Sequence, residues 1–128
     1  NGMAHDHLLQ VIAEFTCDMH NRGVLHRDLS SGNLLLVQEE EGIKPYLIDI
    51  GRARVRNHIN RKTRLIDVMR ICYKLSWDRR EQMMAYYIDY LGRELPNWRF
   101  AVKRYVFKQQ SKRFIKGNIK KAWKKLFS

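Results

Sequence analysis

Two short segments constrain this chain more than any other feature of its sequence. Residues 24–33 read V-L-H-R-D-L-S-S-G-N, and residues 46–53 read Y-L-I-D-I-G-R-A. Together they hold two acids and one amide, at Asp28, Asn33 and Asp49. An H-R-D-x-x-x-x-N loop, followed by a short apolar hairpin that ends in D-x-G, is typical of a phosphoryl-transfer site.

The residue types at these positions suit phosphate chemistry. A transferred phosphoryl group carries charge on its oxygens, so the protein supplies magnesium and orients the nucleophile. Magnesium prefers oxygen ligands, and the carboxylate of Asp49 and the amide oxygen of Asn33 fit that role. Asp28 is left to accept the proton of the acceptor hydroxyl. We therefore expect Asp28 to be the catalytic base, with ATP and Mg²⁺ as cofactors.

Two apolar, β-prone runs separate Asn33 from Asp49. Residues 34–37 and 43–48 are joined by the acidic turn E-E-E-G, which predicts a β-hairpin. Such a hairpin would bring Asn33 and Asp49 to one end of the strand pair. An isolated H-R-D or D-x-G is often only turn chemistry. The joint pattern is much rarer, which favours a catalytic segment over coincidence.

Most of the remaining chain has helical periodicity. Apolar residues recur at helical spacing from Asp6 toward a stop at Gly23. Further helices are expected over residues 63–75, over residues 79–91 with Asp78 as cap and Gly92 as stop, over residues 96–106 and over residues 112–127. The basic stretch, residues 52–62 with Arg64 close after it, is either an anion-attracting segment beside the acceptor or a solvated loop.

Positive charge is concentrated at the C-terminal end. Residues 95–128 hold eleven Lys and Arg and no acid, so residues 1–94 carry only +1 of the formal net charge of +12. We expect residues 1–94 to form the core and residues 95–128 to be its basic helical extension. The apolar side chains at helical spacing in that tail are Ile115, Ile119, Trp123, Leu126 and Phe127. A basic amphipathic helix suits an anionic membrane surface; a packed helix and a nucleic-acid footprint are the alternatives.

Cysteine usage and hydropathy bear on the compartment. Cys17 and Cys72 lie in apolar helical patterns without metal-ligand spacing, which predicts buried thiols in a reduced, cytosolic protein. No run of about eighteen apolar residues and no leader peptide is evident, so no membrane crossing is expected.

The two motifs, together with R-L-I-D-V-M-R-I at residues 64–71, resemble those of the lipopolysaccharide core kinases. These bacterial heptose and Kdo kinases belong to the protein-kinase-like superfamily, and the resemblance covers about residues 5–77. It implies an α+β, mainly helical fold, the C-terminal lobe of a protein-kinase-like fold with a short β-hairpin that carries the metal-binding Asp. In that fold the helix after the activation segment offers an Asp, here Asp67, to the backbone of the H-R-D loop; a surface position is the alternative.

The resemblance also implies roles for individual residues. Asp28, Arg27 and His26 would be catalytic; Asn33, Asp49 and Gly51 would bind the cofactor; and Asn33 and Asp49 would hold the metal. ATP would donate its γ-phosphate to a heptose or Kdo hydroxyl of the lipid A-core. The protein would be cytoplasmic and peripheral to the inner membrane, with the basic tail on the anionic surface.

Two other functions remain open. Atypical kinases of the RIO and Bud32 kind share a similar loop and a short activation segment, and would place the basic tail on RNA. A pseudokinase or binding module is the third. Seventeen residues separate Asp49 from Asp67 and no A-P-E motif lies between them, which favours a sugar acceptor. No Gly-rich loop or strand lysine precedes the motifs, so the N-lobe is expected to be missing and the chain alone inactive.

Overall fold

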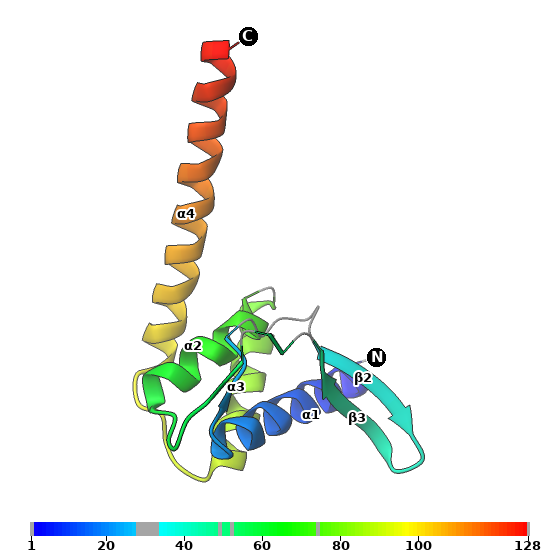
Figure 1. Cartoon of the computed structure of the whole chain (residues 1–128). Coiled ribbons are helices and arrows are strands. Elements are labelled where there is room, and N and C mark those ends of the chain that lie inside the picture. Colours follow the sequence, from blue (N-terminus) through cyan, green and yellow to red (C-terminus); the bar gives the residue numbers. More distant parts are fainter. Residues whose placement is uncertain (1, 28–33, 49, 52, 74, 128) are drawn as a thin grey trace. The chain divides into compact units, whose positions relative to one another are not determined.

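The computed structural model describes residues 2–27, 34–48, 50–51, 53–73 and 75–127 of the chain (Figure 1). Within these ranges the elements are, in order, α1 (Gly2–Asn21), β1 (Val24–Leu25), β2 (Leu34–Glu39), β3 (Gly42–Leu47), β4 (Arg54–Val55), α2 (Arg61–Cys72), α3 (Trp77–Leu91) and α4 (Trp98–Phe127). The chain divides into two compact units, residues 1–96 and residues 97–128. The second unit consists mainly of α4, and the other elements belong to the first.

The core of the first unit is built by three helices. α1 packs against α3 and also contacts β1 and β3, while α2 contacts α3. The buried apolar side chains of these helices include Leu9, Ala13, Cys17 and Met19 of α1, Leu65, Val68, Met69 and Cys72 of α2, and Met83, Met84 and Tyr87 of α3. They recur every three or four residues, as the periodicity predicts. Cys17 and Cys72 are buried free thiols, as predicted, and burial raises the pKa of Cys72 to about 12.

Gly23 ends α1, as predicted. Its φ is +82°, in the left-handed region that glycine adopts without strain, and its N–H donates to the carbonyl of His20 at 3.0 Å. Its own carbonyl accepts the Arg56 N–H at 2.7 Å. A Cβ at Gly23 would overlap the Arg56 carbonyl oxygen. The chain therefore needs glycine here for two independent reasons, conformation and space.

Replacing Gly23 with alanine is expected to lower the free energy of unfolding by about 2–4 kcal/mol, because left-handed strain and the overlap with Arg56 add together. Gly92 is the matched control, since its φ is +78° but no atom lies within 4 Å of a Cβ placed on it. Gly92→Ala should cost only the conformational part, about 1 kcal/mol. Urea denaturation of both variants measures the difference. Equal losses would show that the contact with Arg56 is unimportant.

The predicted hairpin is present as β2 and β3. The strands are antiparallel, with Leu34 opposite Leu47 and Glu39 opposite Gly42, so the turn consists of Glu40 and Glu41. β2 is two residues longer than expected and β3 ends one residue earlier. Because Leu34 pairs with Leu47, the segments that lead to the predicted metal ligands leave the hairpin at the same end.

α2 begins earlier than the periodicity predicts. Asn60 is its N-cap, and the Asn60 side-chain oxygen accepts the N–H of Thr63 at 2.9 Å. The helix therefore includes residues 61 and 62 of the basic stretch. It ends at Cys72, before the predicted end at residue 75.

The predicted cap of α3 is wrong, although its predicted end is confirmed. The Oγ of Ser76, not Asp78, accepts the N–H of Arg79, at 3.4 Å. Asp78 lies in the first turn, where its negative charge interacts favourably with the positive end of the helix dipole. Gly92 is left-handed at the C-terminus, and its N–H donates to the Ile88 carbonyl at 3.0 Å.

α4 is one continuous helix of 30 residues, so the prediction of two helices over residues 96–106 and 112–127 is wrong. The linking residues F-K-Q-Q-S contain neither Gly nor Pro, and Lys and Gln have high helix propensity. None of the helices in the described ranges, α4 included, combines the length and the apolar character that a membrane span requires.

Candidate active site

β1 and β4 bring the two motif segments together. They pair antiparallel, with Val24 opposite Val55 and Leu25 opposite Arg54. His26 directly follows β1, and Ala53 directly precedes β4, so both motifs leave the ladder at the same end. The second motif turns at Gly51, where the Ala53 N–H donates to the Ile50 carbonyl at 3.0 Å.

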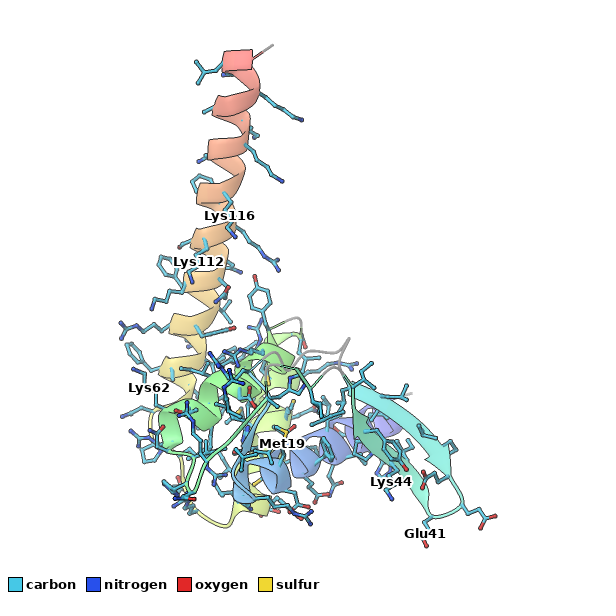
Figure 2. The ribbon with its side chains drawn as sticks, viewed as in Figure 1. Met19, Glu41, Lys44, Lys62, Lys112 and Lys116 are labelled. Carbon is cyan, nitrogen blue, oxygen red and sulfur yellow. The ribbon has the colours of Figure 1, made fainter. Side chains whose placement is uncertain are left out.

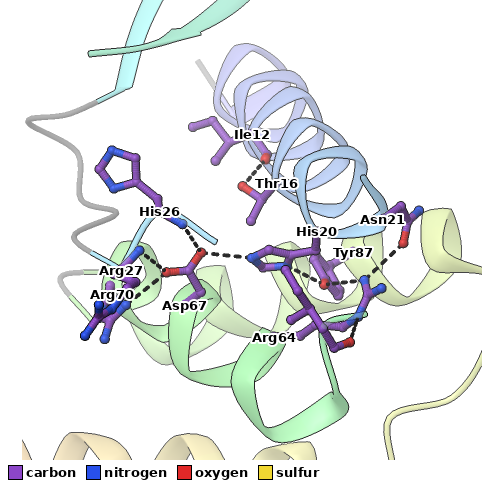
Figure 3. A network of polar contacts seen from close by, with 11 residues as sticks. Ile12, Thr16, His20, Asn21, His26, Arg27, Arg64, Asp67, Arg70 and Tyr87 are labelled. Carbon is purple, nitrogen blue, oxygen red and sulfur yellow. Dashed lines mark hydrogen bonds and ion pairs between the residues drawn. The ribbon is translucent and has the colours of Figure 1, made fainter. Parts of the chain in front are cut away.

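Asp67 of α2 is the centre of a buried polar cluster beside the first motif (Figure 3). Its Oδ2 accepts the His26 N–H at 3.4 Å, and its Oδ1 accepts the Arg27 N–H at 3.2 Å. His20 Nε2 lies 2.9 Å from Oδ2, and Arg70 Nη1 lies 3.0 Å from Oδ1. The predicted contact between Asp67 and the H-R-D backbone is thus confirmed, and the carboxylate binds four donors.

The surroundings of Asp67 keep its carboxyl group ionised. Burial alone raises its pKa, but the hydrogen bond from His20, the Arg27 N–H and the charge of Arg70 together hold the pKa below its ordinary value. A buried carboxylate is stable only when its oxygens are hydrogen-bonded. The cluster provides this for both oxygens.

The contact with Asp67 fixes an unusual backbone conformation at Arg27. Its φ is +70°, one of two positive values among the described non-glycine residues. A non-glycine residue in this region costs about 1–3 kcal/mol and persists only where its surroundings determine it. The two hydrogen bonds from His26 and Arg27 to Asp67 are such a constraint. They hold the backbone of the last two described residues before Asp28.

A chain of hydrogen bonds supports Asp67 from behind. Tyr87 Oη lies 2.7 Å from His20 Nδ1 and accepts from Arg64 Nη1 at 3.2 Å. Arg64 also donates to the Asn21 side-chain oxygen at 3.0 Å and to the Ile59 carbonyl at 3.0 Å. The network therefore ties α1, α2 and α3 together behind the backbone of His26 and Arg27 (Figure 3).

The donors in this network assign the protons of His20. Of the partners that the structure gives Tyr87, only His20 Nδ1 can accept its hydroxyl proton, because Arg64 is a donor. His20 is then neutral and carries its proton on Nε2, from which it donates to Asp67. Burial raises the pKa of Tyr87 far above its ordinary value, and Arg64 only partly offsets this, so the hydroxyl stays protonated.

Three of the predicted site residues, Asp28, Asn33 and Asp49, lie outside the described residues. His26 and Arg27 are placed by their backbone contacts with Asp67, and Gly51 lies in the turn after the hairpin. The catalytic and cofactor-binding roles of all six remain predictions. Within the described ranges no group of three acids, histidines or cysteines could hold a metal ion, and both predicted metal ligands fall outside these ranges.

Sequence reasoning missed most of the supporting network. Arg64 was assigned to the basic stretch, but it is 4% exposed and donates three hydrogen bonds. Tyr87 is buried in α3, and its hydroxyl joins the network. The available signal was a charged residue among apolar positions of a buried helix, the same signal that singled out Asp67.

The family model described as "Lipopolysaccharide kinase (Kdo/WaaP) family" matches residues 1–87, which is more than half of the chain. The chain belongs to the Kdo/WaaP lipopolysaccharide kinase family. Its members are kinases, as the resemblance implied, and α2 with Asp67 falls inside the matched range.

A solved structure supports the fold of this Kdo/WaaP family member. The structure entitled "WaaP in complex with acyl carrier protein" superposes with a TM-score of 0.68 at 20% identity, over 88% of this chain and 50% of that one. The match confirms the α+β, mainly helical fold class. The chain thus spans about half the length of the protein it superposes on.

A sequence relative is similar over a shorter range. A protein of Encephalitozoon cuniculi (strain GB-M1), described as "Probable CTD kinase subunit alpha homolog", is 40% identical over 48 residues. The shared range is 38% of this chain and 14% of that protein. It establishes similarity to a segment of a kinase and no more.

Proposed function

We propose that the protein containing this chain transfers the γ-phosphate of ATP to a sugar hydroxyl of the lipopolysaccharide core, on heptose or Kdo. The observation that carries the proposal is the contact of Asp67 with the backbone of His26 and Arg27. It holds a strained turn directly before Asp28, in a chain whose family consists of lipopolysaccharide kinases. Strain maintained by a buried cluster is typical of functional sites.

Asp28 is the proposed base. Its carboxylate would accept the proton of the sugar hydroxyl and hold that oxygen in line with the phosphate. Asp67 would orient Asp28 by holding the backbone of His26 and Arg27. Orientation matters because phosphoryl transfer depends more on the positions of the reacting groups than on covalent chemistry by the protein. Gly51 would allow the close turn beside the phosphates.

The residues present are compatible with a magnesium ion. Because Leu34 pairs with Leu47, the chain segments that lead to Asn33 and Asp49 leave one end of the hairpin. An amide oxygen and a carboxylate are ligands that magnesium accepts. Asn33 and Asp49 would hold the ion, and a bound ion would neutralise charge on the phosphate oxygens.

The proposed location is the cytoplasmic face of the inner membrane, where the lipid A-core acceptor would be available. The net charge of the chain supports this location, because anionic headgroups attract Lys and Arg at about 1 kcal/mol each near the surface. All eleven positive charges of residues 95–128 lie in α4, without an acid among them.

The test is transfer of labelled phosphate from Mg-ATP by the protein that contains this chain, with any segment that precedes it. Delipidated core oligosaccharide and a general protein acceptor are offered side by side. Label on the sugar is expected. Label on the protein acceptor alone would show that the acceptor is a protein and not a sugar. Label on neither would favour a pseudokinase or binding module.

A protein acceptor is the second candidate function. It is favoured by the 40% identity over 48 residues to a protein described as a CTD kinase subunit homolog. An atypical serine/threonine kinase of the RIO or Bud32 kind would combine that activity with an RNA-associated basic tail. The two-acceptor experiment separates this candidate from the sugar kinase.

A further inference from the structure

α4 carries an apolar stripe that the sequence pattern did not single out. Phe100, Phe107 and Phe114 recur every seven residues, which places them along one face of the helix. Their side chains are 68%, 71% and 70% exposed. The stripe extends over about 21 Å, because each residue of an α-helix rises 1.5 Å. Three large aromatic side chains in one exposed row mark a binding surface.

The apolar stripe lies within a field of positive charge. Side chains project around α4 along its length, with Lys112 and Lys116 among them (Figure 2). The described basic residues beside the stripe or farther round the helix are exposed: Arg99, Lys103, Arg104, Lys108, Lys112, Arg113, Lys116, Lys120, Lys121, Lys124 and Lys125. Long Lys and Arg side chains can reach a charged layer while the helix backbone lies deeper.

We propose that the face of α4 defined by Phe100, Phe107 and Phe114 binds an anionic membrane surface, with the helix lying in the plane of the headgroups. The phenylalanine rings enter the boundary between headgroups and acyl chains, and the cations bind lipid phosphates. The inference rests on the proposed function for its membrane-held acceptor. It differs from the sequence prediction in the side chains that enter the lipid.

Charge and geometry favour a membrane over other partners. A second copy of α4 would bring two helices of high positive charge together, which costs electrostatic energy. Duplex nucleic acid would neutralise the cations, but it has no apolar layer to cover three phenylalanines. An anionic bilayer offers both an apolar layer and a continuous negative surface, which matches cations spread around the helix.

The first test is cosedimentation of the whole chain at low salt with vesicles of equal parts phosphatidylglycerol and phosphatidylcholine. The triple variant Phe100→Ala/Phe107→Ala/Phe114→Ala keeps every cation, yet its partition coefficient should fall at least about tenfold. Leu126→Ala is the control, because Leu126 is 78% exposed on α4 but lies off the stripe. It should change partition less than about twofold. Alanine has a higher helix propensity than phenylalanine. The substitutions should therefore not reduce the helix content measured by circular dichroism.

A second test reports which face of α4 meets the lipid. Phe107→Cys and Lys116→Cys place a thiol on opposite faces, because nine residues turn an α-helix through about 180° beyond two full turns. The native Cys17 and Cys72 are buried and should not react with a polarity-sensitive dye. Anionic vesicles should shift the emission of the dye to the blue at position 107 and not at position 116. Equal shifts, or a shift at position 116 alone, would overturn the proposal.

Other partners would give different outcomes. Equal binding of the triple variant and the wild type would show that the stripe does not contact the lipid. Equal binding to vesicles of pure phosphatidylcholine would show that headgroup charge does not contribute to binding. Lipid-free self-association that the triple variant abolishes would make a second copy the partner. Binding to RNA with steep salt dependence, without binding to vesicles, would assign α4 to nucleic acid. None of these measurements needs phosphate transfer, so failure here is distinguishable from failure of the proposed kinase.

Discussion

Replacing Asp67 with alanine is expected to lower the free energy of unfolding of the chain by about 3–5 kcal/mol, because each buried donor left without an acceptor costs about 1–3 kcal/mol. The variant leaves four donors without their acceptor: His20 Nε2, the N–H groups of His26 and Arg27, and Arg70 Nη1. Three of these groups belong to segments outside α2. The loss therefore loosens the tie between α1, α2 and the backbone of His26 and Arg27.

Urea denaturation followed by far-UV circular dichroism measures this loss. Asp89→Ala is the matched control, because Asp89 is an exposed acid on α3 and should contribute less than about 0.5 kcal/mol. The pKa of Asp67 is lower in the folded state than in the unfolded chain, so its contribution is present above the unfolded pKa and is lost as pH falls through the folded pKa. The difference between wild type and Asp67→Ala should shrink accordingly in acid. A loss under about 1 kcal/mol at neutral pH would contradict the central role of Asp67.

The features that the sequence predicted correctly are those decided by local chemistry. Gly23 and Gly92 end their helices because a left-handed residue there needs glycine. The hairpin follows from two β-prone runs around an acidic turn, and its register follows once the turn residues are known. The Asp67 contact was predicted because an acid inside an apolar helix needs partners and because the family resemblance supplied one.

The features that the sequence failed to predict depend on tertiary contacts or on a choice between neighbours. Arg64 has three acceptors from three separate segments, and no local pattern in the chain shows which acceptors a buried arginine would reach. Ser and Asp are both favourable N-cap residues. Ser76 is the cap because α3 begins at Trp77, which places Asp78 inside the helix. α4 continues through residues 107–111, which the prediction left between two helices, because the helix propensity there continues without a break.

The network gives the proposed chemistry a physical basis. Arg64, Tyr87 and His20 fix the orientation of Asp67, and Asp67 fixes the backbone of His26 and Arg27. The backbone that leads to the proposed base is thus positioned by groups other than that base. A substitution that changes only the chemistry at position 28 should therefore leave the loop in place.

Replacing Asp28 with asparagine is expected to lower kcat for phosphate transfer to the core sugar by about 10²–10⁴-fold, the usual contribution of a general base. Asparagine has nearly the same shape but cannot take the hydroxyl proton. ATP affinity should change little, because the proposed magnesium ligands are Asn33 and Asp49. The free energy of unfolding should also change little, because the described contacts that hold the loop come from Asp67.

Single-turnover transfer and ATP binding, measured on the same preparation, separate these effects. A fall in the rate with unchanged ATP affinity is a loss of transition-state stabilisation alone. Asp89→Asn, a neutralised acid on the exposed face of α3, should keep the wild-type rate. If Asp28→Asn retains turnover within about threefold, Asp28 is not the base. If it loses ATP binding as well, Asp28 contributes to the nucleotide site, and the assignment of Asn33 and Asp49 as the metal ligands needs revision.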